Sequence, residues 1–235
     1  MTLALTTGLA FSSGMGIASG NGTLAVGIDG LLPGGYLADS AAFCARDEQG
    51  DGKSVRNISP AVSWSAGPAG TRSYALLMSD PDVPQDFSLI NRQGTMIAAD
   101  APRVSVFHWV LKDIPASSRA LPQGIESEGF VPGGKPAGKM GHGVRGANVY
   151  TTFLADTPGM AGVYAGYDGP CPPVNDLRVH RYIVRIFALD VETLGLADAF
   201  TGEMLEKAMT GHVLASGQAE GRYTLNPALM DGGEN

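Results

Sequence analysis

Two carboxylates follow an apolar stretch in the first half of the chain. The stretch 73–79 (SYALLMS) has the composition of a buried strand, and Asp80, Pro81 and Asp82 come directly after it. Because proline has no backbone N–H for a strand ladder, the sequence predicts that the sheet stops at Pro81 and holds both acids on a rigid corner. Such acids can orient an imidazole, although aspartates in turns also commonly bond nearby backbone amides.

Histidines occur in two later strand-like stretches. One is His108, inside an apolar run. Alternation predicts that it shares a face with Val106 and Val110, while the opposite face carries Phe107, Trp109 and Leu111. The other is His180, which begins the stretch 180–190 and is followed by Tyr182. A histidine in such a strand is often a satisfied core residue, and this alternative stays open for both.

The composition limits the classes of function. The chain has 235 residues, a net charge of −7, 17% charged residues and 33 glycines, which favours one compact, loop-rich, largely β domain. No Lys/Arg block offers a face for nucleic acid. No apolar run reaches the ~20 residues that a membrane span needs, so we expect no integral membrane segment.

Strand-like runs separated by Gly/Pro-rich turns recur along the chain, at 23–28, 61–65, 73–79, 104–114, 180–190 and 213–225. Their long connections favour an antiparallel sandwich over simple hairpins. One helix is expected between an N-cap at Thr201 and a stop at Gly211. We expect a flexible or docked arm at 1–21 and a single domain at 22–235, with a long surface insertion at about 115–166.

The two cysteines are too few for a disulfide framework. One bond between Cys44 and Cys171 is conceivable, but two free thiols in a reducing compartment are the prediction. The N-terminus has small residues near Ala18 but lacks the basic segment of a signal peptide, since the first arginine is Arg46. A cytoplasmic location is therefore favoured, with periplasmic location or export as the alternative.

Five segments, taken together and in order, resemble the phosphatidylethanolamine-binding proteins, also called Raf kinase inhibitor proteins, in their bacterial branch. They are Asn57-Ile58-Ser59-Pro60 with Trp64, Asp80-Pro81-Asp82-Val83-Pro84, His108-Trp109-Val110, Tyr167-Asp168-Gly169-Pro170-Cys171-Pro172-Pro173 and His180-Arg181-Tyr182. The resemblance covers about residues 22–226. It implies a Greek-key sandwich of antiparallel sheets with a small anion-binding pocket at one end.

The resemblance also implies the residues of that pocket. Carried over one by one, the pocket would contain Asp80, His108, His180 and Tyr182, with Asp82 beside it and Gly169 and Pro170 on the rim. The implied ligand is a small anionic or phosphorylated group, of the phosphate or phospholipid head-group type, and the implied role is regulatory or inhibitory. A protein partner and a homodimer stay open. No helix of the kind that lines the pocket in eukaryotic members follows Tyr223, and the insertion is a candidate to cover the mouth.

The chemistry of these side chains fits an anion site. Two imidazoles and a phenol can donate hydrogen bonds to a phosphate, and Asp80 would serve a histidine by fixing its tautomer and raising its pKa. No nucleophile–base pair is recognisable, so we expect no enzyme activity, no catalytic residue and no cofactor. One alternative is a metal-dependent enzyme that uses His108, His180 and Asp80 as a facial triad. Another is a protein-interaction module whose pocket is a relic.

Overall fold

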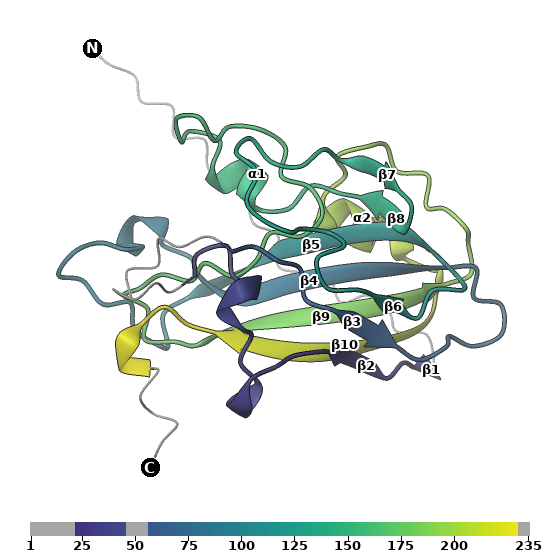
Figure 1. The fold of residues 1–235 in the computed structure, drawn as a ribbon, viewed down its shortest axis with the longest axis horizontal. Helices are drawn as coiled ribbons and strands as arrows, with labels where there is room; N and C mark the ends of the chain where they lie inside the picture. Colours follow the sequence, from purple (N-terminus) through teal and green to yellow (C-terminus); the bar gives the residue numbers. More distant parts are fainter. Residues whose placement is uncertain (1–21, 46–55, 230–235) are drawn as a thin grey trace.

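Two β-sheets form the body of the protein (Figure 1). A computed structural model describes residues 22–45 and 56–229, and the expected arm at 1–21 lies outside these residues. The larger sheet contains, in spatial order, Gly22–Thr23 (β1), Val213–Tyr223 (β10), His180–Leu189 (β9), Ser73–Pro84 (β4), Arg103–Pro115 (β5), Gly143–Arg145 (β8) and Gly138–Met140 (β7). The smaller sheet contains Val26–Ile28 (β2), Val62–Trp64 (β3) and Ala120–Leu121 (β6).

The main core lies between the sheets. Strands β2, β3 and β6 cross one face of the larger sheet (Figure 1). Their buried apolar side chains, among them Val62 and Leu121, pack in one cluster with Leu76, Trp109 and Ile186 from β4, β5 and β9. This architecture confirms the mainly β, sandwich-like class. The neighbours within the larger sheet are antiparallel except β1, which pairs with β10 in parallel.

Helix α2 (Gly202–Met209) covers the opposite face of the larger sheet. Its buried Leu205 and Met209 pack in a second cluster with Leu77, Phe107 and Phe187 of the sheet, so the helix forms a third layer. As the sequence predicts, the Thr201 hydroxyl accepts from the Met204 N–H at its start, and Gly211 follows its end with φ of 84°. Elsewhere in the described part of the chain, the helices are α1 (Tyr150–Phe153) and four short 3-10 turns at Pro33–Gly35, Asp39–Ala41, Phe87–Leu89 and Pro227–Leu229.

Residues 115–166 differ from the expected surface insertion. They contribute β6 to the smaller sheet, extend the larger sheet with β7 and β8, and form α1. Several of their side chains are buried, including Leu121, Glu126, Tyr150 and Tyr164. These short elements could not be predicted from the sequence, because a strand of two or three residues in a glycine-rich segment shows no hydrophobic period.

Strand β4 does not stop at Pro81, contrary to the prediction. It continues to Pro84, still paired with β5, through a bulge in which Asp80 lies opposite Val106 and Val83 opposite Val104. The bulge accommodates a proline without a donor, which is where prolines occur within sheets. The pairing with β9, in contrast, ends at Ser79.

A second bulge changes the expected faces of β5. Met78 lies opposite Trp109 while Ser79 lies opposite Phe107, so His108 is the extra residue on β5. Phe107 therefore packs with Val110 on the α2 side, and not with Trp109 as alternation predicts. The bulge turns the imidazole of His108 toward the start of β9.

Among the described residues, no helix combines the length and apolarity that crossing a membrane requires.

The α2 layer can be tested with two neighbouring residues. Leu205 is fully buried, whereas the Met204 side chain is 47% exposed. We expect Leu205→Ala to lower the free energy of unfolding by about 2–5 kcal/mol and Met204→Ala to change it by less than about 0.5 kcal/mol. Urea unfolding of the two variants measures the difference, and equal effects would show that α2 does not pack on the sheet.

Candidate functional site

The candidate site forms where β4, β5 and β9 meet near one end of the larger sheet. Because β4 runs antiparallel to both neighbours, the end of β4 lies beside the start of β9 and the His108 bulge of β5. This brings Asp80, His108, His180 and Tyr182 together, and each is at most 4% exposed. The structure therefore brings close together four of the residues that the sequence predicts for the pocket.

His180 lies between two carboxylates. Its Nδ1 is 2.7 Å from Oδ2 of Asp80 and its Nε2 is 3.1 Å from Oδ2 of Asp176, which also pairs with Arg103. Burial by itself lowers the pKa of His180, but the charge of Asp80 and the hydrogen bonds to both carboxylates raise it to about 9. At neutral pH this residue is an imidazolium that donates to both acids.

These contacts correct two expectations about His180. Since both ring nitrogens donate to carboxylates, the residue has no donor left for an anion, and its place in the site is that of a buried cation. A metal triad with His108 and Asp80 would need His180 neutral and one nitrogen free. Within residues 22–45 and 56–229, no three His, Cys, Asp or Glu side chains are arranged to hold a metal ion.

The carboxylate of Asp82 is bonded to neighbouring arginines and does not face the site. Its carboxylate accepts from the backbone N–H and the guanidinium of Arg181, at 2.8 to 3.0 Å, and from Arg178 at 3.1 Å. Burial raises the pKa of Asp82, but the hydrogen bonds from Arg181 outweigh it and the net shift is downward. In the predicted carboxylate corner, Asp80 thus pairs with a histidine, and Asp82 pairs with two arginines.

His108 is held by the backbone of Asp168. Its Nδ1 is 2.9 Å from the Asp168 carbonyl oxygen, while the Asp168 N–H donates to the His108 carbonyl at 3.0 Å. A carbonyl only accepts, so Nδ1 carries the proton. Burial lowers the pKa of His108 and outweighs the opposing charge of Asp80. The imidazole is therefore neutral near pH 7, with a lone pair on Nε2.

The side chain of Asp168 fixes this arrangement. Its carboxylate accepts from Lys135 and Asn57 at 2.7 Å and from Asn148 at 2.8 Å, all in the buried interior. Two of these partners, Lys135 and Asn148, come from the 115–166 segment. Sequence reasoning missed both, as well as Asp176. No sequence signal points to Asp176, because a spacing of four residues from His180 brings side chains together only on a helix, and this segment is a loop that leads into β9.

Two tyrosines flank the His108 ring. The ring centroid of His108 is 5.3 Å from that of Tyr182 and 5.6 Å from that of Tyr150, both edge-on. The Tyr150 hydroxyl donates to the Gly169 carbonyl at 2.8 Å. The Tyr182 hydroxyl, in contrast, is fully buried and has no hydrogen-bond partner among the described residues. Burial raises the pKa of Tyr182 well above its ordinary value, so the hydroxyl keeps its proton. The nearby Asp80 carboxylate acts in the same direction, through its charge and through hydrogen bonding at a geometry too poor to satisfy the hydroxyl.

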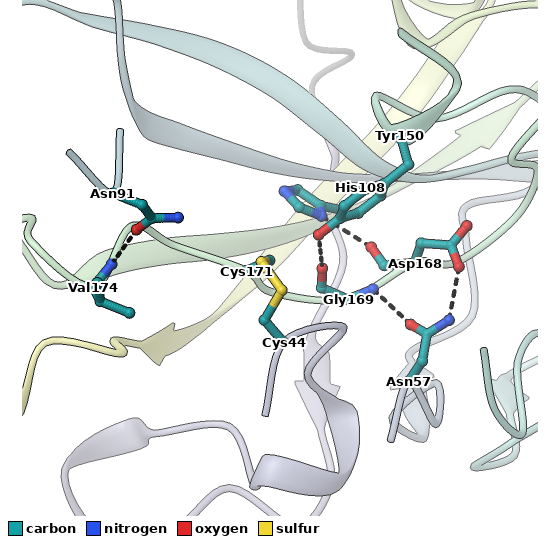
Figure 2. Close-up of a disulfide and its surroundings, with 9 residues drawn as sticks. All are labelled: Cys44, Asn57, Asn91, His108, Tyr150, Asp168, Gly169, Cys171 and Val174. Atoms are coloured by element: carbon teal, nitrogen blue, oxygen red, sulfur yellow. Dashed lines mark hydrogen bonds between the residues drawn. A yellow bond between two sulfur atoms is a disulfide. The ribbon is translucent and has the colours of Figure 1, made fainter. Parts of the chain in front are cut away.

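The loop from Tyr167 to Pro173 is fastened along its length (Figure 2). The Gly169 N–H donates to Asn57, and the Pro170 carbonyl accepts from the Cys44 N–H. A Cβ on Gly169 would lie 1.9 Å from the Ala41 carbonyl oxygen, so only glycine allows this approach. Gly169 and Pro170, predicted as the rim, are both buried in this packing.

A disulfide joins Cys44 to Cys171, so the prediction of two free thiols is wrong. The prediction used only the number of cysteines and the usual redox state of the compartment. The fold brings the two Cα atoms to 4.6 Å across a sequence separation of 127 residues, which the sequence alone does not show. The bond ties the loop that holds His108 to the segment before Ala45, as Figure 2 shows.

A cavity of about 90 Å³ lies next to this site but is distinct from it. It is lined by β5, α1 and the start of α2, with Ser105, Val149 and Gly202 among its walls. His108, His180 and Tyr182 do not line it. The candidate site itself is closed, since its side chains are 0–4% exposed.

Comparison with known proteins identifies the family. The family model described as "Phosphatidylethanolamine-binding protein" matches residues 28–224. The chain belongs to the phosphatidylethanolamine-binding protein family. A UPF0098 protein of Aquifex aeolicus is 32% identical over 177 residues, which cover 74% of this chain and 76% of that protein. The UPF0098 protein YbhB of Escherichia coli is 32% identical over 160 residues, or 68% and 77% of the two chains.

Solved structures show the same fold. The crystal structure of Escherichia coli YbcL, described as a new member of the mammalian PEBP family, superposes with a TM-score of 0.60 and 23% identity. It covers 86% of this chain and 98% of YbcL. A family homologue from Chlamydia trachomatis gives a TM-score of 0.55 at 22% identity, over 86% and 97% of the two chains. The resemblance inferred from the five motifs is confirmed.

The disulfide predicts a definite peptide map for this family member. Unfolded, alkylated but non-reduced protein should yield a linked Cys44–Cys171 peptide pair, which separates after reduction. Reduction should also lower the free energy of unfolding by about 2–5 kcal/mol, as for other native disulfides. Two alkylated cysteines in the non-reduced sample would contradict the bond.

The buried imidazolium predicts how stability depends on pH. Since the pKa of His180 rises from 6.5 in the unfolded chain to about 9 in the fold, its contribution is complete below pH 6.5 and is lost as pH rises through 9. The loss should approach about 3 kcal/mol. Urea unfolding between these pH values measures it.

The matched control for this experiment is His212, whose ring pairs with Asp190 at 2.8 Å but is 42% exposed. His180→Gln should remove the decline with pH, and His212→Gln should leave it in place. If the free energy of unfolding still declined with pH in His180→Gln, a titratable group other than His180 would be its cause.

Proposed function

We propose that this member of the phosphatidylethanolamine-binding protein family binds a small anionic group of the phosphate type at His108 and Tyr182. The family description names a phospholipid, whose head group contains phosphate. The regulatory or inhibitory role implied by the family resemblance is part of the proposal. Asp80 and His180 would not contact the ligand. Their buried ion pair would hold the neighbouring His108 and Tyr182 in position.

The observation that carries the proposal is the Tyr182 hydroxyl. A buried hydroxyl without a partner costs free energy, typically about 1–3 kcal/mol, and is rare in folded proteins. Tyr182 is fully buried, unpartnered among the described residues, and packed edge-on against His108. An anion that accepts from this hydroxyl would recover the cost, which supports a ligand at this position.

The charge balance around the site permits an anion. Asp80 and Asp176 are matched by His180 and Arg103, Asp82 by Arg181, and Asp168 by Lys135. No carboxylate of this group is left uncompensated to repel a ligand. Because these charges nearly cancel, a ligand there would be recognised chiefly by its hydrogen bonds.

Binding must open the site, because an occupant that reaches Tyr182 has to displace part of the wall. Tyr150 of α1 packs against His108 and belongs to the 115–166 segment, which supports a role for that segment as the cover. The disulfide and the hydrogen bonds of Asp168 hold the loop behind His108, so the wall with Tyr150 is the side that would move.

We also propose that the protein acts in an oxidising compartment. The expectation of a cytoplasmic location came from the missing basic segment at the N-terminus and agreed with the predicted free thiols. The Cys44–Cys171 bond contradicts those thiols and favours an oxidising compartment, since structural disulfides persist mainly outside the cytosol. Trapping the thiol state in native cells tests this, and a reduced pair would favour the cytoplasm.

Tyr182→Phe separates binding from stability. Loss of a hydrogen bond to a charged group, worth about 1.5–3 kcal/mol, should weaken binding of inorganic phosphate roughly tenfold to a hundredfold. The stability of the free protein should not fall, because the removed hydroxyl has no partner there. Calorimetric titration and thermal unfolding measure the two effects.

Tyr74→Phe is the control. Tyr74 is also fully buried, and it lies near the start of β4, at the opposite end of that strand from Asp80. Its hydroxyl has a partner, because it accepts a hydrogen bond from the Gly67 N–H at 2.8 Å. The variant should lose stability and keep phosphate binding. Unchanged phosphate affinity in Tyr182→Phe would refute the proposed site.

A further inference from the structure

We propose that the site selects a phosphate that keeps a proton on one oxygen, because Nε2 of His108 accepts a hydrogen bond from that P–OH group. The inference rests on the proposed function and deepens it. It predicts discrimination between hydrogen phosphate and sulfate, two tetrahedral anions of the same charge and nearly the same size, of which only phosphate has a proton to give.

The backbone of Asp168 determines which ring nitrogen of His108 carries the proton. The Asp168 carbonyl oxygen can only accept, and at 2.9 Å it requires the proton on Nδ1. The carbonyl cannot turn away, since the Asp168 N–H is bonded to the His108 carbonyl and its carboxylate is held by Asn57, Lys135 and Asn148. Figure 2 shows the second ring nitrogen of His108 pointing away from this carbonyl. Nε2 is therefore the ring atom left for a ligand.

The surroundings of the ring also determine its charge. A second proton on Nε2 would bury a cation, and burial lowers the pKa of His108 from 6.5 although Asp80 and Asp168 act in the opposite direction. The groups that face the ring from the packed elements are Asp80 of β4, Asp168 and the Gly169 carbonyl of the loop, Tyr150 of α1 and Tyr182 of β9. The nearby cation His180 is fully used by Asp80 and Asp176. The ring thus faces a ligand as an acceptor.

The Tyr182 hydroxyl and Nε2 of His108 together require a ligand that can both accept and donate a hydrogen bond. Tyr182 offers an O–H donor and His108 offers an acceptor. Hydrogen phosphate satisfies both, since P–O⁻ accepts from Tyr182 and P–OH donates to Nε2. Sulfate places an oxygen lone pair against the Nε2 lone pair, unless His108 first takes up a proton from solvent. A site that hydrogen-bonds a ligand OH rejects analogues without it, because its buried polar group is left unpaired.

The two anions therefore differ in pH dependence. Hydrogen phosphate keeps its last proton at mildly alkaline pH, so its affinity should be nearly flat between about pH 7.5 and 8.5, below the pKa of about 9 of His180. Sulfate binding needs a protonated His108, and its affinity should fall about tenfold per pH unit in that range. Phosphate monoesters lose their proton near pH 6, so phosphoethanolamine should also weaken as pH rises. Its slope separates a monoester from free phosphate, and a phosphodiester such as that of a phospholipid, which has no P–OH group, should behave like sulfate.

The experiment is calorimetric titration of the intact protein with inorganic phosphate, sulfate and phosphoethanolamine, at about pH 7.5 and 8.5. We expect phosphate to bind at least about tenfold more tightly than sulfate at the higher pH, and Tyr182→Phe to weaken the binding of both anions together. His108→Gln provides the matched variant, because the amide can donate to either anion. In that variant the ratio of phosphate to sulfate affinity should fall toward one, with folding checked by thermal unfolding.

The outcomes separate the inference from the proposed function. Equal affinities for phosphate and sulfate, both sensitive to Tyr182→Phe, would overturn the selectivity and leave the anion site in place. A preference for phosphate that survives His108→Gln would also overturn it. Binding of neither anion would overturn the proposed function and this inference with it.

Discussion

Four carboxylates at one end of the larger sheet are each about 1% exposed, and the structure of the site depends on neutralising them. A buried charge is tolerated only when it is paired and hydrogen-bonded. Asp80 and Asp176 share the imidazolium of His180, Asp82 takes Arg181, and Asp168 takes Lys135. These pairs tie the end of β4, the start of β9 and the 167–176 loop into one unit.

The same constraint gives the two histidines opposite states. His180 has a carboxylate at each nitrogen and stays protonated, whereas His108 has a backbone carbonyl at Nδ1 and an aromatic environment, and stays neutral. The cation of the site is thus buried behind it, while a ligand bound at the proposed position would meet a neutral acceptor beside a tyrosine hydroxyl. Recognition then depends on which atoms of the ligand carry protons more than on its total charge.

Sequence patterns sufficed for the fold class, the strands around the site and the cap of α2, because these depend on local composition and spacing. The motifs also located Asp80, His108, His180 and Tyr182. The failures concern long-range contacts. The disulfide depends on two Cα atoms meeting across 127 residues, and the partners of Asp168 come from the glycine-rich 115–166 segment, which has no period. The His108 bulge reverses the faces that alternation predicts, and only the pairing with β4 reveals it.

The most direct measurement is the protonation state of the two imidazoles, read from nitrogen NMR of isotope-labelled protein at about pH 7. Two rings are predicted to differ. His180 should show both nitrogens protonated, and His108 should show a protonated Nδ1 and a bare Nε2, with assignments from His180→Gln and His108→Gln. A neutral His180, or a His108 with its proton on Nε2, would contradict the account.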